Sequence, residues 1–414
     1  MKRAALVLLA APMAAHAAVL GHMTPAEPLT DARIASLPAA EQGAWRAYLA
    51  KSQAQLDADQ TALAAERGAG PVPPAPPSGK AGGGMPLNRP AAWYGSPEAR
   101  HVADNIISFQ TPAGGWGKNV DRSGPVRVRG QHYISFEGAK ESWNFVGTID
   151  NDATGTELRF LARVQAQAPG AAGETYRAAF VKGVRYLLNS QYPNGGFPQV
   201  YPLQGGYHDA ITINDDAFSN VLQVLLDAAA RQGDDAFVTP ELAGEARAAA
   251  DRAIRVILAS QIVVNGVRTG WCQQHDELTL APAGARNFEP VALSSFETAR
   301  MLDVLMRLND PSPDIAAAVR AGAAWLERVA VRDVEWTAAS PDAGRRLAAK
   351  AGAGPLWSRY YDISTMKAIF GDRDRSIHDD VNELSLERRN GYGWWGNGPA
   401  KTLQAFAAWS GKHH

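Results

Sequence analysis

Two hexapeptides place closely spaced carboxylates where predicted helices begin. The first, TIDNDA, holds Asp150 and Asp152, and the second, TINDDA, holds Asp215 and Asp216. One acid at a helix entry is an ordinary cap or dipole partner, but like charges this close repel unless a cation or a basic side chain lies between them. If both turns face one cavity, their oxygens suit calcium. The spacing leaves capping and metal binding open as alternatives.

Basic residues form a second candidate group. Arg286, Arg359 and Arg373 lie in loops rich in glycine and aromatic residues, and Lys118 follows Gly-Gly-Trp. Most arginines are solvated surface residues, but loops on a rigid scaffold are where binding residues concentrate. A guanidinium group can grip a carboxylate with two parallel hydrogen bonds. Together with the acidic turns, these residues favour an anionic sugar polymer as the ligand.

Two of the nine histidines and the single cysteine lie in motifs that make them further candidates. His275 and His378 titrate near neutrality and could transfer a proton, although a loop histidine is more often a hydrogen-bonded structural residue. Cys272 is the only cysteine, which excludes an intrachain disulfide. We expect it to be a small packed side chain.

The chain repeats a sequence pattern in which a predicted helix ends in glutamine and a loop with glycine and an aromatic residue follows. The copies begin at Gln110, Gln191 and Gln261, and a degenerate copy occupies positions 391–394. Repetition at this scale indicates stacked helical pairs whose loops open on one face.

The spacing of apolar residues predicts three helical pairs. They are Ala153–Gln167 with Tyr176–Gln191, Ala217–Arg231 with Glu241–Gln261, and Pro290–Leu308 with Ile315–Arg328. This connectivity indicates an all-α fold, a toroid of about three helical hairpins with long loops and a few short strands. The best strand candidate is Val126–Phe136.

The N-terminal quarter has a different organisation. Residues 1–17 combine a basic start, an apolar run and a small-residue exit, as a secretory signal peptide does, so we expect a secreted protein, periplasmic or extracellular. Residues 18–70 form an N-terminal helical region, amphipathic from Leu29 to Arg67. The Pro/Gly-rich residues 71–89 are typical of a linker or an extended strap, and residues 90–414 form the predicted catalytic domain.

Composition sets the outer limits of function. Hydrophobic residues make up 46% of the 414 positions and charged residues 20%, so the chain can bury a large core. The net charge of −1 provides no global field that would draw the protein to nucleic acid or to a membrane surface. Recognition by charge must therefore be local.

Seven blocks of the chain resemble, in order, the family 10 polysaccharide lyases that cleave pectate. The resemblance extends from about Trp93 to Gly411. The blocks are GGWGKN at 114–119, TIDNDAT at 148–154, NGGFPQ at 194–199, TINDDA at 212–217, ARNFEP at 285–290, WSRYY at 357–361 and RNGYGW at 389–394.

The resemblance implies a calcium-dependent pectate lyase on an incomplete (α/α) toroid. Such an enzyme cleaves α-1,4-polygalacturonate by β-elimination and leaves 4,5-unsaturated oligogalacturonides. Arg286 is then the base that removes the C5 proton, Arg359 and Arg373 bind substrate carboxylates, and Lys118 and Asn119 complete the substrate-binding set. The implied metal ligands are the aspartates of the acidic turns, with the choice within each pair open: Asp150 or Asp152, and Asp215 or Asp216. We expect a monomer with a polygalacturonate partner, binding neither nucleic acid nor membrane.

An arginine base restricts the working pH. An unperturbed arginine has a pKa of about 12.5–13.8, so we expect an alkaline optimum, with cations near Arg286 lowering the cost of its neutral form. Two rival functions stay open at this stage. One is a glycoside hydrolase that uses two carboxylates such as Asp152 and Asp216, and the other is a sugar-binding protein without turnover.

Overall fold

A computed structural model describes residues 19–135, 145–168 and 170–413. This part of the protein is predominantly helical, as predicted, and its strands are two to four residues long. The α-helices are α1 (Asp31–Ile34), α2 (Ala39–Arg67), α3 (Pro97–Ser108), α4 (Gly155–Gln167), α5 (Gly170–Ser190), α6 (Ala217–Ala230), α7 (Pro240–Ser260), α8 (Ser295–Leu305), α9 (Pro313–Val329), α10 (Leu386–Gly391) and α11 (Gly398–Ser410).

The strands form sheets of two or three members, which join loops rather than build a layer. The strands are β1 (Val19–His22), β2 (Gly147–Thr148), β3 (Val200–Tyr201), β4 (Ile211–Thr212), β5 (Val263–Val264), β6 (Val267–Arg268), β7 (Gln274–His275), β8 (Pro282–Ala283), β9 (Leu293–Ser294), β10 (Val334–Trp336), β11 (Leu347–Ala349), β12 (Trp357–Ser358), β13 (Tyr360–Tyr361), β14 (Phe370–Gly371), β15 (Ser376–His378) and β16 (Trp395–Gly396). The short 3-10 turns are η1 (Ala91–Gly95), η3 (Asp150–Asp152), η4 (Gly206–His208), η5 (Asn214–Asp216), η6 (Gly233–Asp235) and η7 (Val381–Glu383).

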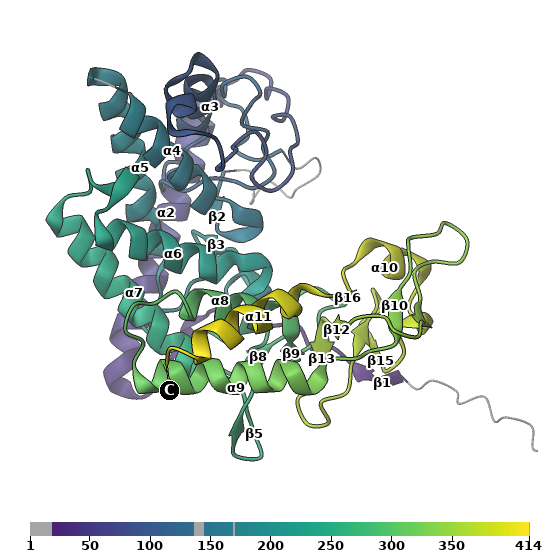
Figure 1. Ribbon diagram of the computed structural model, residues 1–414. Coiled ribbons are helices and arrows are strands. Elements are labelled where there is room, and N and C mark those ends of the chain that lie inside the picture. Colours follow the sequence, from purple (N-terminus) through teal and green to yellow (C-terminus); the bar gives the residue numbers. More distant parts are fainter. Residues whose placement is uncertain (1–18, 136–144, 169, 414) are drawn as a thin grey trace, which may run out of the picture.

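The three predicted helical pairs are confirmed as the hairpins α4–α5, α6–α7 and α8–α9. The second helices of two hairpins, which we call outer helices together with α5, begin at N-cap residues. Thr239 caps α7 and Ser312 caps α9, and a proline follows each cap. The first helices of the hairpins pack in the series α4, α6, α8, and the second helices pack in the series α5, α7, α9 (Figure 1). The loops before α4, α6 and α8 therefore lie in neighbouring positions.

The glutamine of each repeat has a structural role. The side-chain amide of Gln110 donates to the carbonyls of Gly114 and Ala179, both at 2.8 Å, and so joins its own loop to α5. Gln191 joins its loop to α7 and Gln261 joins its loop to α9 by the same pair of bonds. Because these amides are bonded within the scaffold, the repeated Gln-Gly-aromatic pattern has a structural role in the helical stack. The acidic turns and the arginines remain the candidates for the chemistry.

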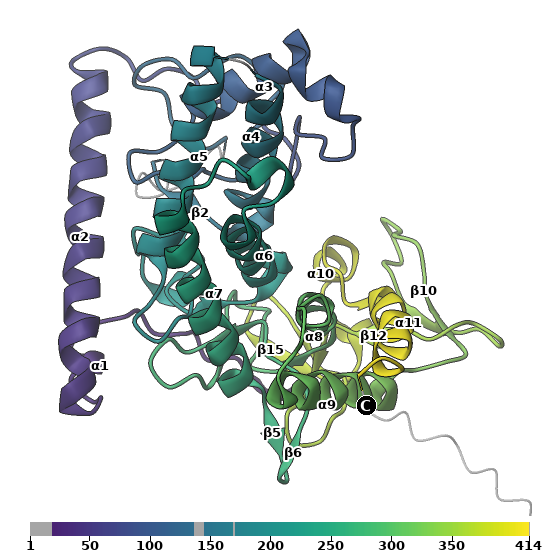
Figure 2. The ribbon, with the colours of Figure 1, turned by 60° about the vertical axis from the view of Figure 1, so that its left-hand side comes forward.

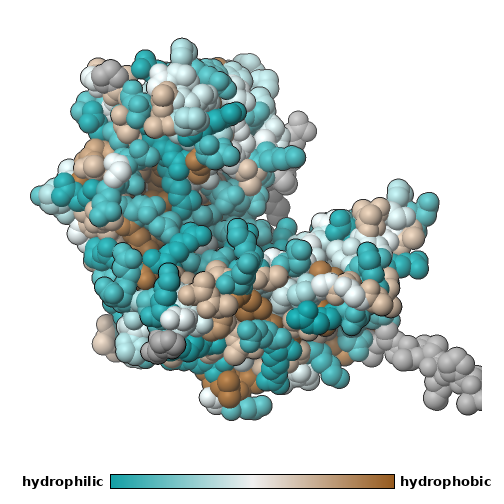
Figure 3. Space-filling model, in the orientation of Figure 1, coloured by the Kyte–Doolittle hydropathy of each residue, from teal (hydrophilic) through white to brown (hydrophobic). Residues whose placement is uncertain are grey.

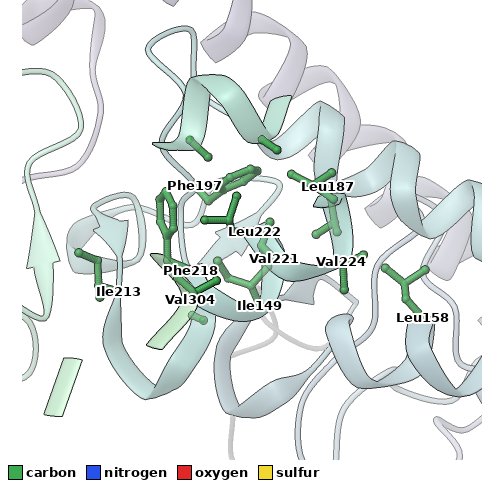
Figure 4. Packing of buried hydrophobic residues seen from close by; sticks show 14 of the residues in the cluster. Ile149, Leu158, Leu187, Phe197, Ile213, Phe218, Val221, Leu222, Val224 and Val304 are labelled. Carbon is green, nitrogen blue, oxygen red and sulfur yellow. The ribbon is translucent and has the colours of Figure 1, made fainter. Parts of the chain in front are cut away.

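Apolar residues in the acidic turns anchor them to the main core. Ile149 and Ile213 each precede an acidic cluster and are 2% and 1% exposed. Figure 4 shows both among the buried side chains of the stack, near Phe197, Phe218 and Val221. The carboxylates that follow are thereby held in a fixed position relative to the core.

The N-terminal region is bound to the helical stack. Helix α2 stands on the side of α5 and α7 (Figure 2), and the rings of Trp45 and Tyr48 lie 5.1 Å and 4.8 Å from that of Tyr192. The predicted helix from Leu29 to Arg67 is interrupted before residue 39, because Pro38 cannot continue it. The expected signal peptide lies outside the described residues.

Residues 71–89 are tied along the body at several points, as an extended strap would be. Ser78 bridges to Val120, the amide of Gly79 donates to the Asn119 carbonyl at 2.9 Å, and the amide of Arg122 donates to the Gly83 carbonyl at 3.1 Å. The strap thus passes beside the first Gly-aromatic block.

The strand predicted at 126–136 is wrong over its described residues, 126–135, which form no ladder. The alternation arose from Val126 and Val128, which are about half exposed. Arg127 fixes the loop instead, because it is paired with Glu66 of α2.

The molecule has two arms that meet at an angle in Figure 1, with α3–α6 in one and α8–α11 with the C-terminal strands in the other. Hydrophilic residues predominate where the arms meet (Figure 3). None of the helices in the described ranges is both long enough and apolar enough to cross a membrane.

The packing of α2 generates a stability prediction. Trp45→Ala should lower the free energy of unfolding by about 3–5 kcal/mol, the usual cost of deleting a buried tryptophan, because this side chain is 3% exposed. Urea unfolding followed by circular dichroism measures the change. Val267→Ala is the control, since Val267 is 63% exposed and should change stability by no more than about 0.5 kcal/mol. Equal small effects would show that α2 lies outside the cooperative core.

Candidate active site

The two acidic turns share an unusual backbone. Asn151 and Asp152 have φ of 52° and 61°, and Asp215 and Asp216 have φ of 48° and 63°. Left-handed backbone costs most residues with a side chain about 1–2 kcal/mol, and Asn and Asp tolerate it better than the others. Such strain persists where the surrounding structure enforces it, and it clusters at functional sites. Its occurrence in both copies indicates that the turns are built to aim their carboxylates.

These carboxylates do not cap helices. Thr154 is the N-cap of α4 and Asp216 that of α6, and neither side chain accepts a bond from the helix. The capping alternative is therefore wrong for these turns. Their carboxylates have other partners: Asp150 pairs with Lys118, Asp152 Oδ1 accepts from Asn220 Nδ2 at 2.7 Å, Asp215 Oδ1 lies 3.1 Å from Arg359 Nη2, and Asp216 Oδ1 lies 3.1 Å from Arg300 Nε.

Negative charge remains concentrated around the turns. Burial raises the pKa of Asp216 to about 6; Arg300 opposes this rise, and the charges of Asp152 and Glu297 add to it. Asp150 Oδ1 is buried and has no hydrogen-bond partner among the described residues. Over the same residues, no group of three His, Cys, Asp or Glu side chains is arranged to hold a metal ion by itself. A cation here would need further oxygen ligands from outside the chain.

Arg359 connects the second turn to the third inner helix. It lies between β12 and β13, is 9% exposed, and its Nη2 is 2.7 Å from Asn214 Oδ1 and 2.6 Å from Glu297 Oε1. Burial alone would lower the pKa of Arg359, but the charge of Glu297, supported by Asp215, outweighs it and the pKa is raised. This arginine is therefore fixed in its charged form.

Arg286 lies in the loop between β8 and β9 and is held by Glu289. Its Nε donates to Glu289 Oε2 at 2.8 Å, and its Nη2 donates to the other oxygen of the same carboxylate. Burial would lower the pKa of Arg286, but Glu289 outweighs burial and the pKa is raised. Glu289 is itself 2% exposed and accepts a 2.7 Å bond from the hydroxyl of Tyr392. The orientation of Arg286 is thus set by a buried network.

Arg373 lies beside Arg286 at the surface. The two guanidinium groups lie 4.8 Å and 5.2 Å from the ring of Phe288. Arg373 is 61% exposed and is bonded by two 3.1 Å contacts to Glu387. It lines neither of the two cavities that contain the other predicted residues.

These two adjoining cavities form the candidate cleft. The larger, of about 910 Å³, lies among the two acidic turns, α8 and α11. The smaller, of about 80 Å³, shares Asn151 and Asp215 with it. Asp152, Asp216 and Arg359 line the larger cavity, and Lys118, Asp150 and Arg286 line the smaller one. Asn119 lies next to both, because its Oδ1 accepts a 3.2 Å bond from Asn151 Nδ2.

The alternative proton-transfer groups have structural partners. His275 is fully buried in β7, with Nδ1 2.9 Å from the Leu280 carbonyl and Nε2 accepting from the Cys272 amide at 3.2 Å. Burial lowers the pKa of His275 to about 4. His378 is bonded to Ser376 and Glu383. Cys272 is buried, as expected.

Glu289, Glu297 and Tyr392 were not predicted from the sequence as members of the site. Glu297 lies in the first turn of α8, the third inner helix, where the first two inner helices follow acidic turns. Glu289 is three residues after Arg286, a spacing at which oppositely charged side chains can meet. The position of Glu297 and the spacing of Glu289 can both be read in the sequence. Neither observation shows which charged side chain each glutamate contacts in the folded protein.

A helical scaffold that gathers arginines and carboxylates in one cleft is the arrangement of an enzyme acting on an acidic carbohydrate. The family model for pectic acid lyase matches residues 110–403. A family 10 polysaccharide lyase from Cellvibrio cellulosa has 33% sequence identity and a TM-score of 0.68, over 79% of this chain and 97% of that one. An aspartate-to-alanine mutant of a family 10 lyase from the same organism, in complex with trigalacturonic acid, has 33% identity and a TM-score of 0.67, over 78% and 97%. A search of curated proteins finds no match.

The chain therefore belongs to the pectic acid lyase family and is a polysaccharide lyase. The resemblance to family 10 is confirmed.

The buried histidine generates a pH prediction. The pKa of His275 is about 4 in the folded protein and 6.5 without burial, so the unfolded chain binds this proton more tightly. The stabilisation it provides is complete above pH 6.5 and is lost as the pH falls toward 4, by about 3 kcal/mol at 1.36 kcal/mol per pKa unit.

The measurement compares urea unfolding of the parent and of His275→Gln from pH 7 to 4. The stability difference between them should shrink by about 3 kcal/mol over this range. A difference that stays constant with pH would show that folding does not lower the pKa of His275.

Proposed function

We propose that this protein cleaves α-1,4-polygalacturonate by calcium-assisted β-elimination and releases 4,5-unsaturated oligogalacturonides. The observation that carries the proposal is the shared cleft, in which Arg286 and Lys118 meet the carboxylates of both strained turns. A cleft of this charge suits a uronate chain whose carboxylates are matched by cations. Trigalacturonic acid bound to the related lyase supports the same substrate class.

The residues of the acidic turns fit a calcium ion. They are oxygen donors whose side chains accept no capping bond from the helices. The charges of Asp152 and Glu297 help to raise the pKa of Asp216, as expected where a cation is missing between acidic groups, and Asp150 Oδ1 is buried without a hydrogen-bond partner in the described residues. One aspartate of each turn, Asp150 or Asp152 and Asp215 or Asp216, would hold the ion, with substrate carboxylates supplying further ligands. Calcium, when bound, neutralises the uronate carboxylate and makes the neighbouring C5 proton more acidic.

Positively charged side chains orient the substrate. Lys118 faces the smaller cavity with Arg286, and Asn119 fixes the position of Asn151 between the cavities. Arg359 presents a permanent charge to the larger cavity. In this proposal Arg373 binds a carboxylate at the outer edge, where it stacks on Phe288 beside Arg286.

Arg286 is the base in the proposed reaction. A nitrogen of its neutral guanidine takes the C5 proton, the C5 electron pair forms the C4–C5 double bond, and the C4–O bond breaks. The departing glycosidic oxygen takes a proton from water. Because Glu289 raises the pKa of Arg286, the neutral form is rare near neutrality, and an alkaline optimum follows.

We also propose the finer organisation of the chain. The consecutive packing of α4, α6, α8 and of α5, α7, α9 supports an incomplete (α/α) toroid. Residues 1–17 would act as a signal peptide for secretion, residues 18–70 as a helical brace, residues 71–89 as a strap and residues 90–414 as the catalytic domain of a monomer.

One assay tests the reaction. Incubation with polygalacturonate and calcium should raise both ultraviolet absorbance, from the new double bond, and the number of reducing ends. Chelation should abolish activity, and calcium should restore it better than magnesium, because magnesium demands a tighter octahedral site. Reducing ends alone would identify a hydrolase, and no change in either would identify a binding protein. Full turnover after exhaustive chelation would remove the metal from the mechanism.

A second prediction concerns Arg286. Arg286→Lys should lower kcat by about 10²–10⁴-fold, the usual contribution of a general base, and leave KM within a few-fold, because the residue acts in the transition state. Glu289→Gln should move the rising limb of the kcat–pH profile to lower pH, since Glu289 raises the pKa of Arg286.

Arg389→Lys is the matched control: this arginine lies in α10 and bonds to the Ala343 carbonyl, away from the cleft. A large rise in KM with kcat intact in Arg286→Lys would make Arg286 a binding residue. If the rising limb of the kcat–pH profile does not move in Glu289→Gln, that limb does not report the titration of Arg286.

A further inference from the structure

The candidate cleft continues into a groove that the proposed chemistry does not use. A cavity of about 910 Å³ lies between the C-terminal half of α8 and helix α11. It shares Arg300, Asp303 and Lys401 with the larger cavity of the cleft. The two spaces therefore adjoin, and the shared side chains lie at the boundary that a long ligand would cross.

The charge of the lining changes along this path. Asp152, Asp215, Asp216 and Glu297 line the cleft. Four cationic and two acidic side chains line the groove, which we call the basic groove. The acidic residues are Asp303 and Asp310, and the cationic residues are Arg300, Arg307, Lys401 and Lys412. Negative charge at the reacting end thus gives way to an excess of positive charge.

Three of these cations are available to a ligand. Arg307, Lys401 and Lys412 are exposed and make no ion pair with any residue in the described ranges. Arg300 makes one contact, with Asp216, through Nε. The groove also has an apolar lining, to which Met306 and Trp409 contribute. Unpaired cations beside apolar surface suit a carboxylated sugar, which has charged edges and apolar faces.

The small size of the cavity at Arg286 means that a polymer must extend beyond it. This cavity has about 80 Å³, against about 910 Å³ for the larger cavity of the cleft. The remaining residues of a polymer must lie in the larger cavity and beyond it, and the basic groove, also of about 910 Å³, is a continuation that offers opposite charge.

We propose that the basic groove binds carboxylates of uronate residues beyond the reacting pair, so that the enzyme favours long polyuronate chains over short ones. This inference rests on the proposed function. Each additional uronate carries one carboxylate, and exposed cations attract it at a range set by ionic strength.

The test compares chain lengths. Arg307→Gln with Lys412→Gln removes two charges from the groove, and the ratio of kcat/KM on polygalacturonate to kcat/KM on trigalacturonate should fall about five-fold, as expected for two exposed ionic contacts. In the parent, the same ratio should decline as salt rises from about 0.05 to 0.5 M, because exposed charges are screened.

The matched control is Arg247→Gln with Arg328→Gln. These exposed arginines lie on α7 and α9, make no ion pair with the residues described here, and line neither the cleft nor the groove. The control changes net charge equally and should keep the parental ratio. An unchanged ratio in the groove variant, or an equal fall in both variants, overturns the proposal.

Calorimetry with polygalacturonate separates this inference from the proposed function. If no variant shows lyase activity on either substrate, the proposed function has failed. The groove is then judged by affinity alone: weaker binding in the groove variant than in the control supports it, and equal binding rejects it. Both double variants alter exposed side chains, so circular dichroism should show the parental fold for each.

Discussion

The cleft depends on one buried guanidinium group, that of Arg359. It is 9% exposed and contacts Asn214, Asp215 and Glu297, so it joins the segment between β12 and β13 to the second acidic turn and to α8. Removing one partner of a buried ion pair leaves an uncompensated charge, which costs far more than the intact pair contributes. The three elements are therefore obliged to keep their relative positions, and the width of the cleft follows from that obligation.

The strained turns are likewise held in place by the residues and strands around them. A left-handed aspartate would relax in an isolated peptide, but here Ile149 and Ile213 are buried below the carboxylates and strands β2 and β4 hold the approach. Side chains across the cleft then complete the fixation, Lys118 for the first turn and Arg300 for the second. Core packing thus maintains the backbone strain, and the carboxylates are held in place for the cation and substrate of the proposed function.

Local patterns predicted the hairpins, because helical periodicity, caps and repeat spacing are properties of neighbouring residues. They also identified Asp150, Asp152, Asp215, Asp216, Arg286 and Arg359, which the structure places around one cleft. The pairing of Glu297 with Arg359 joins residues 62 positions apart, and no periodicity encodes such a contact. The failed strand at 126–135 has a related cause: two exposed valines imitated alternation, while Arg127 was engaged by Glu66, 61 positions away.

Glu289 imposes two opposing demands on Arg286. Its bidentate bond, backed by Tyr392, fixes the plane of the guanidinium group beside the cleft, yet the same carboxylate stabilises the protonated form. A guanidinium that points correctly but holds its proton cannot act as a base, whereas one released from Glu289 loses its orientation. The neighbouring cations Lys118, Arg359 and Arg373 disfavour additional positive charge in the cleft. If Arg286 is the base, as we propose, reactivity depends on the balance between one buried carboxylate and the cations that accompany the substrate, and this balance would confine the proposed chemistry to alkaline conditions.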